Sequence, residues 1–222
     1  MMKSDFWLLK SLRLATNGIT QGKYEQVRCP ADPEHLFGRR KFGELWVELP
    51  SRALRDFEWT WTSDLFISPH ALQVLKDNDV TGFETRPLMK VTYRKRSRGE
   101  PPPLFELAVT GWGGMGESAG VELIEFCPSC RLRRYRIAEP GRLVDPSAWD
   151  GSDFFIVWPL PLYRFVSDRL AHIIRRNRLS GVKLIPPAEL AAKLSGEAGP
   201  PSLDEIMPES RALEFGKKFD LL

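Results

Sequence analysis

The chain contains an internal duplication. Residues 67–84 (ISPHALQVLKDNDVTGFE) and 166–183 (VSDRLAHIIRRNRLSGVK) align without a gap. Identical residues mark the same local features in both copies: Ser68 and Ser167, Asn78 and Asn177, Gly82 and Gly181. A serine at a helix start, an amphipathic stretch and a glycine at the helix exit predict one strand–helix–strand unit per copy.

The similarity extends to the N-terminal side of each copy, where WTSDLF at 61–66 resembles WDGSDFF at 149–155. We therefore expect repeat units at about 61–93 and 149–185. Alternating apolar runs separated by Gly, Asn and Pro turns indicate further strands, as at 45–49. The sequence predicts a strand-rich α+β fold with two related strand–helix–strand units from an internal duplication.

Composition along the chain suggests where this fold ends. The segment RKRSRGEPPP at 94–103 combines charge with consecutive prolines and predicts an exposed, flexible loop. Residues 196–210 are rich in Gly, Pro and Glu, so we expect 196–222 to be a loosely packed C-terminal tail. Residues 1–195 are expected to form a single α+β domain.

The overall composition is that of an ordinary globular protein. The 222 residues carry a net charge of +3, which is too small to indicate nucleic-acid binding by itself. No window resembles a signal peptide or a membrane span, and an odd number of cysteines, three, argues against a disulfide framework. We expect a cytoplasmic protein with no membrane partner.

The cysteines form one complete and one incomplete metal knuckle. Cys127 and Cys130 have the CxxC spacing that lets two thiolates reach one tetrahedral Zn²⁺, and Cys29 begins a similar segment that ends in Asp32. Asp32 or His35 could supply a fourth ligand. Two interpretations remain open, a metal-free remnant that needs no cofactor or one structural zinc site, and both predict that the three cysteines are neighbours in space.

A serine-hydrolase motif also occurs. Residues 116–120 (GESAG) match GxSxG, with Ser118 as the nucleophile, and several aspartates followed by His172 could complete a triad in sequence order. The residues before Gly116 are glycines, whereas the motif requires a core strand that leads into a helix. A hydrolase is therefore the weakest of the functional hypotheses.

Candidate partner-binding residues come from the residue types that dominate protein interfaces. Trp112 lies among glycines, where it could be an exposed anchor or could cover a small apolar patch. Arg133 and Arg134 belong to a basic run, RLRRYR at 131–136, and a second run, RKRSR, occupies 94–98. If these arginines contact a partner, its surface should be acidic.

Taken together, the Cys-Pro knuckles about a hundred residues apart, the WDGSDFF segment and the repeated Ser–helix–Gly unit resemble the double-CxxCG immunity proteins of myxobacterial toxin systems. The resemblance covers about residues 24–185. Of the family's two CxxCG motifs, the cysteines that match are Cys29, Cys127 and Cys130. The first site here reads CPAD, and Arg131 follows the second in place of Gly.

The resemblance implies a protein that is not an enzyme and that neutralises a cognate toxin by direct stoichiometric binding. A second hypothesis, from another class, is a zinc-knuckle regulator that contacts nucleic-acid phosphates through the two basic runs. Nucleic acid is the less expected partner, because both runs are short and the net charge is small.

Overall fold

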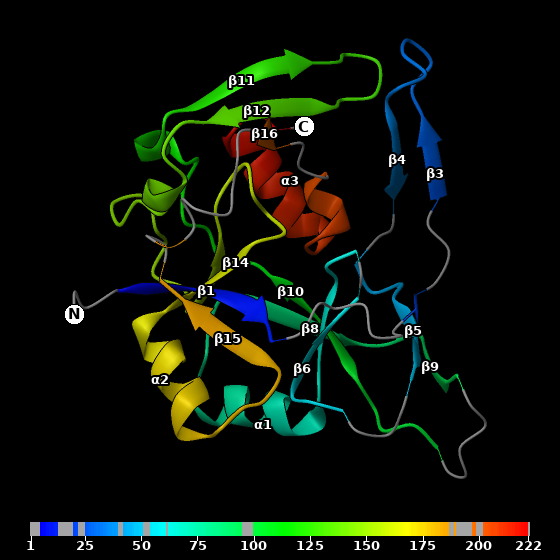
Figure 1. Ribbon diagram of the computed structural model, residues 1–222, viewed down its shortest axis with the longest axis vertical. Coiled ribbons are helices and arrows are strands. Elements are labelled where there is room, and N and C mark those ends of the chain that lie inside the picture. The colour runs from blue at the N-terminus through cyan, green and yellow to red at the C-terminus, as the bar shows by residue number, and fades with distance from the viewer. Residues whose placement is uncertain are drawn as a thin grey trace.

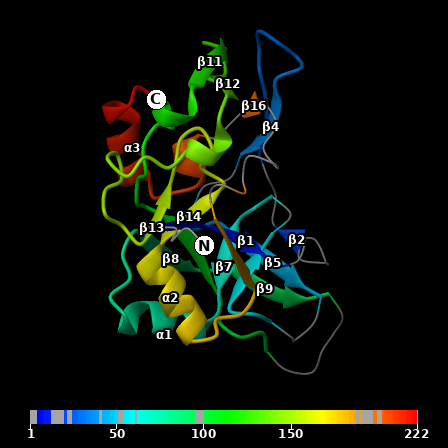
Figure 2. The ribbon, with the colours of Figure 1, turned by 60° about the vertical axis from the view of Figure 1, so that its left-hand side comes forward.

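The computed structural model describes residues 5–12, 20–21, 25–39, 42–50, 54–60, 62–94, 100–186, 189, 197–198 and 202–221. Within these residues strands predominate over helices, and the strands form several separate sheets. The predicted strand-rich α+β fold is confirmed. Figures 1 and 2 show the two helices of the duplication side by side at one end of the molecule and two β-hairpins at the other.

The two copies of the duplication have the same local structure, as predicted. Helix α1 (Pro69–Asp77) and helix α2 (Asp168–Arg176) both begin after a serine whose hydroxyl accepts a backbone N–H from the first turn. The residue that follows each helix is an asparagine whose side chain donates to the carbonyl four residues earlier. These caps satisfy backbone groups that a free helix end would leave unpaired.

Each helix is followed by a glycine that the fold requires. Gly82 and Gly181 have φ angles of +80° and +93°, and a Cβ added to them would lie 2.0 and 2.1 Å from the carbonyl oxygens of Phe154 and Phe57. Phe154 belongs to the second copy and Phe57 to the first. Each glycine turn therefore packs directly on the backbone of the opposite copy.

Two four-stranded sheets carry the helices. One has the order β13 (Phe154–Ile156), β14 (Arg164–Ser167), β1 (Phe6–Ser11), β15 (Val182–Ile185). The other has the order β6 (Phe57–Trp59), β7 (Leu65–Ile67), β10 (Phe105–Val109), β8 (Phe83–Pro87). Both sheets are antiparallel throughout and have the same arrangement of strands relative to the helix.

The ladders reveal that the copies exchange a strand. Trp7 of β1 lies opposite Val166, and Phe105 of β10 lies opposite Ile67, the equivalent of Val166. Strands β1 and β10 are therefore equivalent, yet β1 pairs within the sheet of the second copy and β10 within the sheet of the first. The repeat consists of β1–β6–β7–α1–β8 and β10–β13–β14–α2–β15, and each copy gives its first strand to the other.

The predicted alignment of 61–66 with 149–155 is wrong. Phe57 pairs with Ile67 and Phe154 pairs with Val166, so β13 is the equivalent of β6 and not of the segment that leads into β7. The turn between β13 and β14 is two residues longer than the turn between β6 and β7. An alignment without gaps cannot bridge this difference, and the resemblance between the two short segments is accidental.

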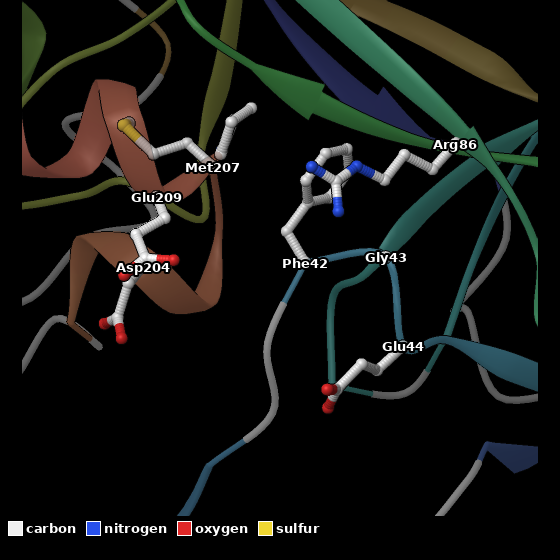
Figure 3. Close-up of a pocket in the computed structure, with 8 residues that line it drawn as sticks. Phe42, Gly43, Glu44, Arg86, Asp204, Met207 and Glu209 are labelled. Atoms are coloured by element: carbon white, nitrogen blue, oxygen red, sulfur yellow. The ribbon is translucent and has the colours of Figure 1, made fainter.

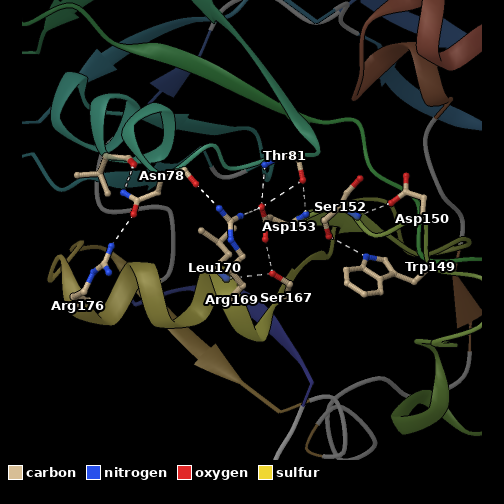
Figure 4. Close-up of polar contacts among 11 residues, drawn as sticks. Asn78, Thr81, Trp149, Asp150, Ser152, Asp153, Ser167, Arg169, Leu170 and Arg176 are labelled. Atoms are coloured by element: carbon tan, nitrogen blue, oxygen red, sulfur yellow. Dashed lines mark hydrogen bonds and ion pairs between the residues drawn. The ribbon is translucent and has the colours of Figure 1, made fainter.

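An aspartate at the start of β13 links the copies (Figure 4). Asp153 accepts hydrogen bonds from the hydroxyl of Ser167 at 2.7 Å and from the backbone N–H of Thr81 at 3.1 Å, and it pairs with Arg169. Ser167 caps α2, whereas Thr81 belongs to the glycine turn of the first copy. One buried carboxylate thus fixes the start of one helix against the exit of the other.

Asp56 makes the equivalent contacts in the first copy. It accepts from the hydroxyl of Ser68 at 2.9 Å, from the backbone N–H of Ser180 at 2.8 Å and from His70 at 2.9 Å. His70 aligns with Arg169, so a nitrogen-bearing side chain contacts the carboxylate in both copies. Hydrogen bonds to a charged group are stronger than those between neutral groups, so these two aspartates add polar links between the copies to the apolar core.

The core lies between the two sheets and the helices. Its fully buried members include Phe57, Phe154, Leu75, Leu170 and Val166. A second cluster around Phe155, Phe165 and Leu143 covers the other face of β13 and β14. Both copies contribute to both of these clusters, whereas a third cluster, around Leu45, Val47 and Phe66, lies almost entirely within the first copy.

Smaller sheets surround this centre. Strand β5 (Trp46–Leu49) pairs with β2 (Thr20–Gln21) and, in parallel, with β9 (Lys90–Tyr93). Strands β3 (Glu25–Arg28) and β4 (Leu36–Arg39) form one hairpin. Strands β11 (Val121–Phe126) and β12 (Arg133–Ile137) form another, to which β16 (Glu197–Ala198) adds a short third strand. Residues 95–99 of the predicted flexible loop lie outside the described residues.

The C-terminal segment differs from the expected loose tail. Helix α3 (Glu209–Lys218) packs onto the glycine-rich segment after β10, where Phe215 and Phe219 contact the ring of Trp112 at centroid distances of 4.6 and 4.8 Å. Met207 is fully buried. The Gly, Pro and Glu content of 196–210 suggested a tail, but Met207 within this segment is buried, and Phe215 and Phe219 after it cover the ring of Trp112.

Among the described residues, no helix combines the length and the apolar character that a bilayer crossing requires.

Candidate metal centre

The two β-hairpins outside the main sheets carry the cysteine knuckles. Cys29 directly follows β3, and Cys127 directly follows β11, 98 positions later. In each loop the cysteine N–H donates back across the turn, from Cys29 to the carbonyl of His35 and from Cys127 to that of Leu132. The two loops occupy equivalent places in the two copies, and their tips meet near the top of Figure 1.

Four side chains converge where the tips meet. The ligand atoms of Cys29, His35, Cys127 and Cys130 all lie within 4.8 Å of one another. The Sγ atoms of Cys29 and Cys127 are 3.6 Å apart, and Nδ1 of His35 is 3.6 Å from Sγ of Cys130. Four ligands arranged tetrahedrally at about 2.3 Å from one metal ion would be separated by about 3.8 Å. The cluster therefore has the size and the donor set of a Cys₃His site that could hold one metal ion.

The structure confirms the prediction that the three cysteines are neighbours. It also decides between the two candidates for the fourth ligand, because His35 joins the cluster and Asp32 does not. One oxygen of Asp32 accepts the backbone N–H of Glu34 at 2.8 Å and so shapes the loop. Asp32 occupies the place of Cys130 in the first copy, and a histidine three residues later compensates for the missing thiol.

In the absence of a metal ion, the side chains of the cluster would differ in charge. Hydrogen bonds to Cys127 and then to Cys29 raise the pKa of His35 to about 9. The backbone N–H of Cys130 lowers the pKa of Cys127 to about 6, against the effect of burial. Burial raises the pKa of Cys130 to about 11. At neutral pH the site thus contains an imidazolium beside a thiolate, and a metal ion would have to displace the protons on His35 and Cys130.

Carboxylates surround the far side of the imidazole. Nε2 of His35 lies 3.0 Å from Oε1 of Glu125 and 3.4 Å from Oδ2 of Asp32. The other carboxylate oxygen of Glu125 is 2.9 Å from a guanidinium nitrogen of Arg134. The side chains therefore follow one another in the order Arg134, Glu125, His35, cysteine cluster.

The three candidate partner-binding residues are all engaged within the chain. Trp112 is 3% exposed beneath α3, so the hypothesis of an exposed anchor is wrong. Arg133 donates to the backbone carbonyls of Asp220 and Leu221, and Arg134 pairs with Glu125. The structure thus assigns intramolecular contacts to both arginines.

Ser118 lies in a short 3₁₀ helix, Glu117–Ala119, and not at a strand-to-helix turn. Its hydroxyl donates directly to Asp145 at 3.2 Å. His172 is exposed on α2, and its Nδ1 contacts the carbonyl of Asp168. A triad would need a histidine between the serine and the aspartate, and this geometry gives that hypothesis no support.

The cavity shown in Figure 3 lies between residues 42–44, Arg86 and the segment before α3. Its volume is about 210 Å³, and the Arg86 guanidinium lies 5.0 Å from the centre of the Phe42 ring. The remaining polar side chains of its wall are carboxylates, and it contains no serine, cysteine or histidine. Most ligand pockets are larger and combine apolar walls with converging polar groups.

Sequence reasoning missed Glu125, which lies 90 positions from His35 along the chain. No local pattern marks this residue, since a glutamate in a half-exposed strand is ordinary. The closeness of His35 and Glu125 could have been predicted only by recognising that the β3–β4 and β11–β12 hairpins are equivalent parts of the repeat. The exchanged strand hides the full extent of that repeat.

No known family model matches this chain, and no curated protein matches it.

Proposed function

We propose that this protein is a cytoplasmic immunity protein that neutralises a cognate toxin by direct stoichiometric binding, on a scaffold held by one structural zinc ion. The observation that carries the proposal is the meeting of two knuckles from equivalent positions of a duplicated chain. The double-CxxCG resemblance rested on two such segments about a hundred residues apart. Their convergence into one Cys₃His cluster supports the metal-site part of the proposal.

The donor set favours zinc in a structural role. Three thiolates and one imidazole suit Zn²⁺, and four protein ligands complete its tetrahedral coordination. No position would then remain for the water or substrate that a catalytic zinc requires. The site would instead link the β3–β4 hairpin of the first copy to the β11–β12 hairpin of the second.

Zinc binding is tested on protein purified without chelator. We expect one zinc per chain by elemental analysis, and Cys127→Ser should abolish it and lower the thermal stability. Ser129→Ala in the same loop is the matched control, because Ser129 is exposed and is not among the ligands. Full zinc content in Cys127→Ser would refute the assignment of this site.

Neutralisation is tested by coexpression with a toxin encoded beside this gene. The proposal requires that growth is rescued and that the purified proteins form a complex of fixed stoichiometry. Salt-sensitive binding to DNA without toxin binding would favour a nucleic-acid regulator. Hydrolysis of an activated ester that is lost in Ser118→Ala would favour the hydrolase. Either result would replace the immunity function and leave the zinc site unaffected.

A further inference from the structure

The Cys₃His cluster has a feature that neither knuckle alone would provide. One ring nitrogen of its histidine faces the cysteines, and the other faces a carboxylate from the opposite copy. Nδ1 of His35 is directed to Cys130, and Nε2 is directed to Glu125. In metal sites such a carboxylate accepts the proton of the nitrogen that is not bound to the metal, and so fixes the tautomer and the ring orientation.

The position of Glu125 depends on an irregularity in its strand. The β11–β12 ladder shifts register between Leu123 and Glu125, so that Glu125 lies opposite Arg134. A β-bulge changes the direction in which the following side chains point. Because Arg134 holds one carboxylate oxygen at 2.9 Å, the other oxygen is left to face His35 at 3.0 Å.

From these contacts we infer that Glu125 is a positioning residue that makes His35 an Nδ1 ligand of the zinc ion, with Arg134 holding the carboxylate in place. The inference rests on the proposed zinc site and adds to it how the one non-cysteine ligand is oriented. It also gives Arg134, a candidate for partner binding, a role within the chain. The first copy has Asp32 where the second has Cys130, and the second copy supplies the carboxylate that orients His35.

The test compares two glutamates of the same strand. Glu125→Ala removes the carboxylate that faces His35, and Glu122→Ala is the matched control, because Glu122 also pairs with an arginine of β12, Arg136, at 3.2 Å. Zinc affinity is measured by competition with a chromophoric chelator. We expect Glu125→Ala to weaken binding about 10- to 100-fold, as loss of such a carboxylate does in other metal sites. Glu122→Ala should leave it within about twofold, and Glu125→Gln, which keeps an acceptor, should recover part of the loss.

A direct measurement on the unaltered protein makes the inference testable even if Glu125→Ala does not fold. Long-range ¹H–¹⁵N correlation spectra of the zinc-loaded protein should show His35 protonated at Nε2 and metal-bound at Nδ1. The opposite tautomer, or equal affinities of Glu125→Ala and Glu122→Ala in a protein that binds zinc, would overturn this inference alone. A wild-type protein that binds no zinc would overturn the proposed site as well.

Discussion

At the scale of single residues, the fold depends on two glycines that act across the boundary between the copies. Gly82 and Gly181 combine a left-handed backbone with a carbonyl oxygen of the opposite copy only 2.0 and 2.1 Å from where a Cβ would be, far inside van der Waals contact. Either condition alone favours glycine, and together they exclude every other residue.

We predict that Gly82→Ala and Gly181→Ala each lower the free energy of unfolding by at least about 3 kcal/mol, because the chain must relieve a clash besides the strain of a positive φ. Gly151 is the matched control. Its φ is +85°, but no atom lies within 4 Å of an added Cβ. Gly151→Ala should therefore cost only about 1–2 kcal/mol. Chemical denaturation measures all three, and equal costs would show that the contact between the copies is unimportant.

At the scale of elements, the β3–β4 hairpin is the part most dependent on the metal site. Among the described residues its strands pair only with each other. An isolated two-stranded hairpin is marginally stable in water. The β11–β12 hairpin differs, since β12 also pairs with β16 and Tyr135 packs against Trp158 in the core.

We expect removal of zinc to increase amide hydrogen exchange in 25–39 far more than in 121–137. The physical reason is that chelation removes the metal-mediated link between the first hairpin and the rest of the molecule and leaves weaker contacts such as that of His35 with Glu125. Exchange followed by mass spectrometry, with and without chelator, gives the measurement. Cys127→Ser without chelator should reproduce the effect, and unchanged exchange in 25–39 would contradict it.

Zinc affinity should increase with pH between about 6.5 and 8.5. The raised pKa values of His35, about 9, and Cys130, about 11, mean that both groups hold protons in the metal-free protein over this range. Because bound zinc requires both to be deprotonated, each adds about a tenfold gain in affinity per pH unit. The lowered pKa of Cys127, about 6, means that this thiol adds to the pH dependence only at lower pH. Competition with a chelator at several pH values tests this slope, and a pH-independent affinity would contradict it.

At the scale of the whole molecule, the exchange of β1 and β10 makes one cooperative body from two similar units. Each sheet contains a strand from the other copy. Asp153 and Asp56 each join the start of one helix to the glycine turn of the opposite copy. We therefore do not expect either half of the chain to fold alone.

We predict that Leu75→Ala and Ile174→Ala, one in each copy, each cost about 2–5 kcal/mol and shift a single unfolding transition. Both side chains are buried, with exposures of 0% and 3%. Leu213→Ala on the exposed face of α3 is the control and should stay within about 0.5 kcal/mol. Calorimetry distinguishes this from independent copies, which would show two transitions of which each substitution moves only one.

The sequence by itself determined the local structure of the duplication. Serine caps and amphipathic helices are read from residues close together, so the strand–helix–strand structure of 67–84 and 166–183 was predicted correctly, although the helices end at Asn78 and Asn177 and not at the glycines. The proximity of Cys29, Cys127 and Cys130 was also predictable, because thiol pairs with knuckle spacing have few purposes other than a shared site.

Only the tertiary structure decided the rest, since it depends on contacts between distant segments. The exchange of β1 and β10 cannot be recognised in the local sequence, because the two sheets are similar and either strand could pair in either of them. The choice of His35 over Asp32, the approach of Glu125 and the burial of Trp112 under α3 follow from how the exchanged copies pack. Local sequence fixes the conformation of each unit, whereas the burial of apolar surface between units fixes which of them meet.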